Sequence, residues 1–176
     1  HLDPTNFDYG SHHVVQEIIE DVVGNDRENH QHQFISHYYN HYEHPAFPPA
    51  WMLMELVSFG ATSRIFRHFK GVHRLEVASR LSLQHDIMES WLHTLAFARN
   101  VCAHHGRTWN RNFTIQPKIP RSSRDDWPQE SARKVYSVCA IIHHLMGIIA
   151  DGSRWSQRLA DLVAARPNIP LNAMGF

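Results

Sequence analysis

Apolar side chains recur at spacings of three and four residues along most of the 176-residue chain, and this periodicity limits the folds open to it. A period near 3.6 residues places such groups on one face of an α-helix, whereas a half-buried strand needs strict alternation. The longest alternating run covers only residues 113–119. We therefore predict an all-α fold, with antiparallel helices packed as a bundle.

Serine caps and glycine or proline stops divide this pattern into separate helices. They predict helices over about residues 11–23, 28–42, 51–59, 62–69, 74–79, 82–105, 130–150 and 153–166. Residues 108–128 contain three prolines and are predicted to form an ordered loop excursion. Trp51, Phe59 and Cys102 lie in apolar helical patterns, so we expect them to be buried.

Charge is distributed unevenly, although 17 basic and 17 acidic residues cancel over the whole chain. Residues 1–60 hold nine acids and one base, a balance of −8, whereas residues 99–134 hold eight bases and three acids, a balance of +5. Zero net charge argues against a generic nucleic-acid coat protein. The basic segment suits a polyanionic partner, and the alternative is an ordinary solvated surface.

No apolar run approaches the roughly 18 residues of a membrane span, and no secretory segment opens the chain. The two cysteines, Cys102 and Cys139, are expected to be free thiols of a reducing, cytoplasmic compartment. His37 and His41 have a zinc-compatible spacing among the 16 histidines. Because no H-E-x-x-H motif or paired C-x-x-C motif accompanies them, we expect surface histidines and no metal site.

One segment of the sequence indicates a chemical reaction. Arg99, Asn100, His104 and His105 place a fixed cation, a carboxamide and two imidazoles within seven residues, at the end of a predicted helix. These groups are what the cleavage of an RNA phosphodiester needs without a metal. The structural alternative is that Arg99 pairs with an acid while His104 stabilises the helix end through the helix dipole.

Helix geometry indicates that one chain holds only half of a symmetric site. Asn100 and His104 share a helix face, but Arg99 lies about 140° around the helix from His104. A two-fold homodimer that apposes two such helices would bring two arginines and two histidines together. We therefore expect the protein to act as a homodimer.

Two longer motifs resemble those of a known family. The pattern R-N-x-C-A-H-H-x-R-x-W-N-R over residues 99–111 resembles the signature of the Abi-like abortive-infection proteins (the AbiD/AbiF group), which belong to the HEPN superfamily. The pattern P-x-W-x-x-x-E-x-x-S-F-G over residues 49–60 is similar to another element of that family. Shorter matches are His37-Tyr38, Tyr42, Ser90-Trp91-Leu92 and Met174-Gly175-Phe176.

The resemblance implies a single HEPN-like helical domain over residues 1–176, and it implies that the full-length protein has further N-terminal helices and a C-terminal tail. It implies that Arg99 and His104 cleave RNA without a metal, commonly from a dimer, and that Asn100 is the polar residue often following the arginine. Beside them we expect RNA-binding residues, with Trp109 as a base-stacking ring. These residues are His105, Arg107, Trp109, Asn110 and Arg111.

The predicted function is a metal-independent, toxin-like endoribonuclease of a phage-defence system that attacks through the ribose 2′-OH and uses no cofactor. An antitoxin or a regulatory RNA stays open as a further partner. The alternative is a non-catalytic RNA-binding or regulatory module in which the same residues only bind phosphate. A third class is a helical protein-interaction domain in which they are structural. RNA binding without turnover would select the second class, and no RNA binding would select the third.

Overall fold

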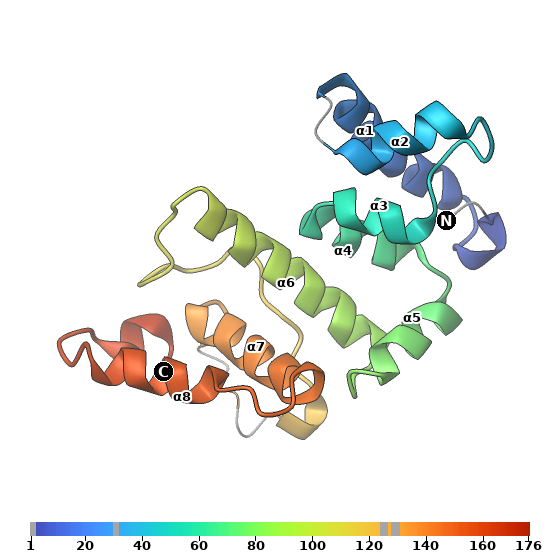
Figure 1. Cartoon of the computed structure of the whole chain (residues 1–176). Helices are drawn as coiled ribbons and strands as arrows, with labels where there is room; N and C mark the ends of the chain where they lie inside the picture. The colour runs from blue at the N-terminus through green and yellow to red at the C-terminus, as the bar shows by residue number, and fades with distance from the viewer. Residues whose placement is uncertain (1–2, 30–31, 124–126, 128–130) are drawn as a thin grey trace. The chain divides into compact units, whose positions relative to one another are not determined.

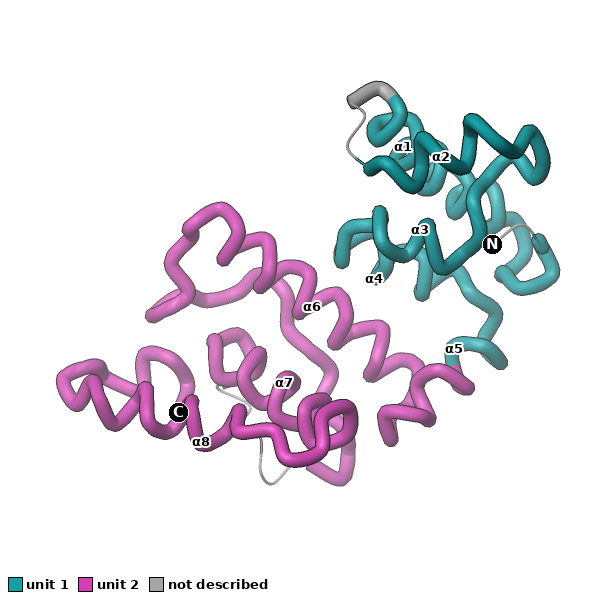
Figure 2. Tube along the Cα trace, viewed as in Figure 1, with its two compact units in different colours: residues 1–74 teal, residues 75–176 magenta. Residues whose placement is uncertain are grey.

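The computed structural model describes residues 3–29, 32–123, 127 and 131–176 (Figure 1). The chain forms two compact units, His1–Arg74 and Leu75–Phe176, and each is described here by itself (Figure 2). The described residues contain eight α-helices and no strand beyond an isolated bridge between Phe7 and Phe69. The all-α prediction is therefore confirmed, while the HEPN-specific arrangement stays a prediction. None of the described helices is both long and apolar enough to cross a membrane.

Unit 1 is built around its first helix. The buried face of that helix, with Val15, Ile19 and Val23, forms the core together with Phe7 and Leu53. The Phe7 ring stacks on Phe69 at 5.1 Å, which holds the N-terminal segment against the end of the fourth helix. The helices are α1 (His12–Asn29), α2 (Gln33–His41), α3 (Ala50–Leu56), α4 (Phe59–His68) and α5 (Gly71–Ser79), the last of which crosses into unit 2.

The first helix passes through the glycine that was predicted to end it. Gly24 lies inside α1, which continues to Asn29, so the second helix begins at Gln33 and not near residue 28. An interior glycine costs a helix about 1 kcal/mol relative to alanine. Burial of Val23 offsets this cost, as does the hydrogen bond that the buried Asp26 carboxylate accepts from His32 Nδ1 at 2.5 Å.

A serine determines where α4 begins after α3. The predicted stop at Gly60 is wrong, because α3 ends at Leu56 and the Ser58 hydroxyl accepts a hydrogen bond from the Ala61 N–H at 3.1 Å, which caps α4. The expected burial of Trp51 and Phe59 is also wrong. The Trp51 side chain is 68% exposed and Phe59 36% exposed, so neither belongs to the core of unit 1.

Unit 2 contains α6 (His85–Ala103), α7 (Val135–Ile149) and α8 (Trp155–Ala164). Helices α6 and α7 run in opposite directions: the Trp91 ring meets His144 at 5.1 Å, whereas Ala98, two turns later, packs near Val138 (Figure 1). The antiparallel prediction therefore holds for this pair. Helix α7 begins at Val135, after the predicted start near residue 130, which lies outside the described residues.

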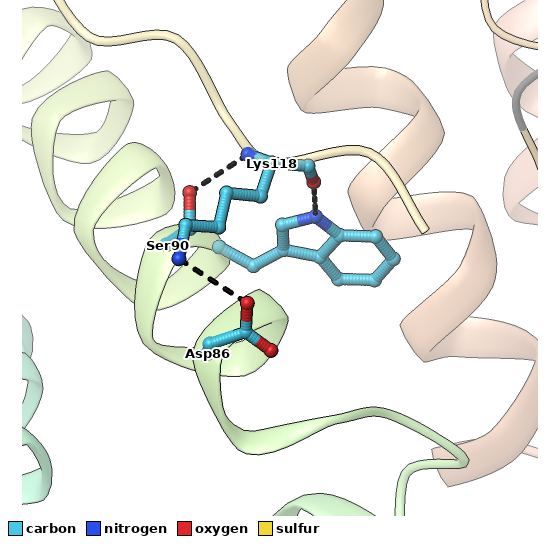
Figure 3. A network of polar contacts seen from close by, with 4 residues as sticks. Asp86, Ser90 and Lys118 are labelled. Carbon is cyan, nitrogen blue, oxygen red and sulfur yellow. Dashed lines mark hydrogen bonds and ion pairs between the residues drawn. The ribbon is translucent and has the colours of Figure 1, made fainter. Parts of the chain in front are cut away.

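A loop returns from the end of α6 along the same helix, and hydrogen bonds attach it to the helix at Lys118 (Figure 3). The Trp91 indole N–H donates to the Lys118 carbonyl at 2.9 Å, and the Lys118 N–H donates to the Ser90 hydroxyl at 2.8 Å. Phe113 and Pro117 are buried, whereas their alternate neighbours face solvent. The alternation over residues 113–119 thus reflects real one-sided burial, but against a helix and not within a sheet.

The residues at the C-terminal end of the sequence pack beside the start of α7. The Ser131 hydroxyl donates to the Gly175 carbonyl at 2.5 Å, and the Phe176 ring meets Tyr136 edge to face at 5.2 Å. Gly175 has a φ of +90°, and a Cβ there would lie 2.7 Å from Lys134 Cβ. Glycine is therefore required at this position of the Met174-Gly175-Phe176 motif.

The Lys118 ammonium, 3.2 Å from the Asp86 carboxylate, should make the loop attachment sensitive to acid. Burial alone would raise the pKa of Asp86, but the hydrogen bond and charge of Lys118 outweigh burial and lower it. Because both side chains are partly exposed, we expect Lys118→Met to lower the free energy of unfolding by about 0.2–1 kcal/mol at neutral pH. A carboxyl whose pKa is lowered on folding stabilises above its unfolded value, about 3.9, and this contribution is lost as the pH falls through the folded pKa.

Urea unfolding should therefore show a difference between wild type and Lys118→Met that shrinks below about pH 4. In an Asp86→Asn background the same substitution should cost little at any pH. A cost that is unchanged in acid would show that the lysine acts through its methylene chain and not through its charge.

Candidate active site at the end of helix α6

Helix α6 ends in two backbone hydrogen bonds that fix the direction of the following chain. The His105 N–H donates to the Cys102 carbonyl at 3.0 Å, and the Gly106 N–H donates to the Val101 carbonyl at 2.7 Å. This is the Schellman arrangement of a helix C-terminus, in which one residue takes a left-handed conformation. Here that residue is His105, with a φ of +52°. His104 is the C-cap, so α6 ends at Ala103, two residues before the predicted end.

Gly106 has a different role from the one its sequence position suggested. It does not hold the left-handed conformation, because His105 does. A Cβ at Gly106 would lie 2.9 Å from both the carbonyl oxygen and Cγ1 of Val101. Glycine is therefore needed here for the close approach of two backbone segments, and His105 carries the strain of the turn.

Arg99 and Asn100 interact with each other on the exposed surface of the last turns. Arg99 Nη1 donates to Asn100 Oδ1 at 3.3 Å, and both residues are exposed. Within the part of the chain that the structure describes, no carboxylate forms an ion pair with Arg99. The structural alternative, in which an acid holds this arginine, is therefore without support among the described residues. The sequence had not indicated that Asn100 would bind Arg99.

His104 completes the helix with its backbone, while its side chain is exposed to solvent. Its N–H donates to the Asn100 carbonyl at 3.1 Å and so completes the helix, as the structural alternative also required. Its side chain is exposed, one turn beyond Asn100. Asn100 thus contacts Arg99 through its side chain and His104 through its backbone. The two predicted catalytic residues are therefore both attached to Asn100.

The predicted RNA-binding residues all lie in the loop that directly follows His104, and all are exposed. The loop is held by aromatic packing. The Arg111 guanidinium carbon lies 6.0 Å from the centre of the Phe97 ring, and Phe97 meets the buried Phe113 edge to face at 5.5 Å. Between these supports, Asn110 has a φ of +47° and Trp109 is 37% exposed. Arg107, Trp109 and Asn110 therefore occupy a tight, accessible turn beside the helix end.

The surroundings of this site are basic. Residues 99–123 contain five arginines and lysines and no acid, and only Lys118 among these bases forms an ion pair within the described residues. The three acids counted in the charge balance, Asp125, Asp126 and Glu130, lie outside the described residues together with Arg124. The unpaired bases described at this helix end favour the approach of a polyanion.

Two further predictions about side chains can be compared with the structure. Cys102 is exposed, so its expected burial is wrong: the buried residue in the last turn of α6 is Val101. The His37 and His41 rings lie 4.0 Å apart. No group of three or more metal-binding side chains gathers anywhere in the described ranges, these histidines included.

A comparison with protein-family models identifies the relatives of this chain. The model of the Abi-like proteins matches residues 1–110, which is more than half of the sequence. The chain belongs to the Abi-like protein family. Membership implies a role in abortive infection, a defence against bacteriophages. The matched region includes the motif over 49–60 and nearly all of the motif over 99–111. No curated protein and no solved structure matches the chain.

The strained end of α6 gives a prediction for this Abi-like protein. His105→Gly should relieve a left-handed conformation that costs a side-chain-bearing residue about 1–2 kcal/mol, part of which is offset by the greater freedom of glycine in the unfolded chain. Gly106→Ala should instead lower the free energy of unfolding by about 1–3 kcal/mol, because its methyl group would overlap Val101.

The free energies of unfolding of the two variants, measured by thermal or urea unfolding, should therefore change in opposite directions. Gly24→Ala in α1, where a Cβ meets no atom within 4 Å, is the control for an ordinary helix glycine and should stabilise. A loss of stability in His105→Gly would contradict the assignment of strain to His105.

Proposed function

We propose that this Abi-like protein is a metal-independent endoribonuclease that cleaves RNA during phage defence, with Arg99 and His104 as its catalytic residues. One observation carries the proposal. Among the described residues, the exposed Arg99 guanidinium is bound to a neutral carboxamide and to no acid, and it lies at the same helix end as an exposed imidazole. Both groups are accessible to a phosphodiester without breaking an ion pair.

In the proposed reaction the ribose 2′-oxygen attacks the adjacent phosphorus as it loses its proton to a general base. The bond from phosphorus to the 5′-oxygen breaks, and a proton is delivered to that oxygen. His104 serves one of these two proton transfers. Arg99 stabilises the charge that develops on the phosphoryl oxygens, and Asn100 orients the guanidinium through its amide oxygen. Arg107 and Arg111 bind neighbouring phosphates, and Trp109 stacks on a base.

Cleavage of total RNA by the purified protein in EDTA tests this mechanism. Arg99→Ala and His104→Ala should each lower the rate by about 10²–10⁴-fold, the usual effect of losing general acid–base catalysis or charge stabilisation. Matched controls are Arg64→Ala on α4 and His93→Ala on α6, which remove an exposed residue of the same type elsewhere. These controls should retain wild-type activity.

The products provide a second readout of the same experiment. Attack by a 2′-OH leaves a 2′,3′-cyclic phosphate, or its hydrolysis product, and a 5′-hydroxyl, so DNA and RNA with a 2′-deoxy cut site should resist. Activity that vanishes in EDTA and returns with Mg²⁺, or 5′-phosphate ends in mass spectrometry, would contradict the mechanism. RNA binding without turnover would leave a non-catalytic RNA-binding module as the function.

We also propose that two copies complete the site. The exposed Cys102 and Ala103 extend α6 beyond its packed part, and Arg99 lies about 140° around the helix from His104. A two-fold contact along this helix end would therefore bring the Arg99 of one copy toward the His104 of the other.

Mixing inactive variants tests the shared site. Arg99→Ala and His104→Ala protomers should regain partial activity together, because a mixed dimer holds one composite site with both residues intact. Light scattering should show a dimer at the assay concentration. A monomer that cleaves RNA at the same rate per chain would exclude the shared site, whereas the single-variant results above would still stand.

A further inference from the structure

Unit 2 contains a cavity of about 920 Å³ that the proposed reaction does not use. It is lined from α7 and α8, with Trp91 of α6 at one wall. Trp91 is the one described lining residue within the region matched by the family model. The volume lies in the range of about 300–1,000 Å³ that small-molecule sites occupy in proteins.

Aromatic rings form much of the wall. Trp91 and Trp127 lie 6.0 Å apart, Trp127 meets Tyr136 edge to face at 6.4 Å, and Tyr136 meets Phe176 in the same way at 5.2 Å. Trp155 adds a further indole from α8. Such rings offer flat apolar surfaces, and they favour a planar ring as the occupant more than a flexible chain.

The polar side chains of the lining are imidazoles, hydroxyls, indoles and a thiol. The His143 Nδ1 and Ser156 hydroxyl lie 2.7 Å apart, and both residues are exposed enough to exchange this bond for one with a ligand. Burial raises the pKa of the Cys139 thiol to about 11, so the thiol is neutral at physiological pH. None of the described residues that line the cavity is an aspartate, glutamate, lysine or arginine.

We propose that this cavity binds a nucleobase, an uncharged planar heteroaromatic ring whose edge forms hydrogen bonds with His143 and Ser156. The base can come from a free nucleoside or from an unpaired position of an RNA, because both present the same ring. The phosphate of a nucleotide would have to remain outside the cavity, since the described lining offers no lysine or arginine to bind it. This inference goes beyond the proposed cleavage and does not require it.

A glycine in the cavity wall allows a test that preserves the fold. Gly147 lines the cavity from α7, and a Cβ at this position meets no atom within 4 Å. Gly147→Leu should therefore narrow the cavity while the greater helix propensity of leucine keeps or raises the melting temperature. Gly24→Leu in α1 is the matched control, because it changes another open helix glycine that does not line the cavity.

The measurement is a titration with adenosine, followed by calorimetry and by tryptophan fluorescence, since Trp91, Trp127 and Trp155 line the cavity. We expect saturable binding by the wild type and Gly24→Leu, and at least a tenfold weaker affinity for Gly147→Leu. A short oligoadenylate with a 2′-deoxy backbone provides the second arm. If it binds with the same sensitivity to Gly147→Leu, the cavity accepts bases of a strand; if only adenosine binds, the ligand is a free nucleoside.

Three outcomes would overturn the proposal. The first is that neither adenosine nor the oligoadenylate binds up to about 1 mM, and the second is that Gly147→Leu and the wild type bind equally. The third is that no nucleoside binds, whereas Gly147→Leu selectively loses the binding of decanol or self-association. The assay reads binding and not cleavage. Its failure therefore leaves the proposed nuclease untouched, and a failed nuclease assay leaves the nucleobase site untouched.

Discussion

The hydrogen bond from the Trp91 indole to the Lys118 carbonyl is the interaction on which the arrangement of unit 2 depends. Trp91 is only 2% exposed, and its ring also contacts Trp127 and His144. One side chain therefore joins α6, the returning loop and α7. An unpaired buried indole N–H would cost about 1–3 kcal/mol, so the loop is held in one register along the helix. The candidate site lies where that loop begins, and there the backbone bonds at the end of α6 and the packing on Phe97 fix the chain.

The turn at His105 has a consequence for the two neighbouring imidazoles. A left-handed residue reverses the chain direction at the end of a helix, so the side chains before and after it leave the backbone toward different sides. His104 keeps the helical relation to Asn100, whereas His105 belongs to the loop with Arg107 and Trp109. Under the proposed function, this division assigns His104 to the reacting phosphate and His105 to the neighbouring part of the bound RNA.

The sequence predicted the helices well where an apolar stripe decided them, and poorly where local signals competed. The stripe of Ile87, Trp91 and Ala98 correctly indicated α6, because its period matches the packed face. Gly24 and Gly60 gave misleading stops, since tertiary burial and the Ser58 cap outweigh a single glycine. Exposure of Trp51 and Cys102 could not be predicted from periodicity, which shows a face but not whether another element covers it.

The candidate site was predictable as a cluster but not as a set of contacts. Sequence spacing placed Arg99, Asn100 and His104 at one helix end, yet the bond between Arg99 and Asn100 depends on rotamers that spacing does not specify. This bond matters for binding. A neutral amide holds the guanidinium in place without cancelling its charge, whereas a carboxylate would have to be displaced by every incoming phosphate. Phosphate contacts to arginine are charge-assisted and stronger than a bond to a neutral oxygen. Under the proposed function, a phosphodiester would therefore replace Asn100 at Arg99 with a net gain, because the amide leaves the charge of the guanidinium intact.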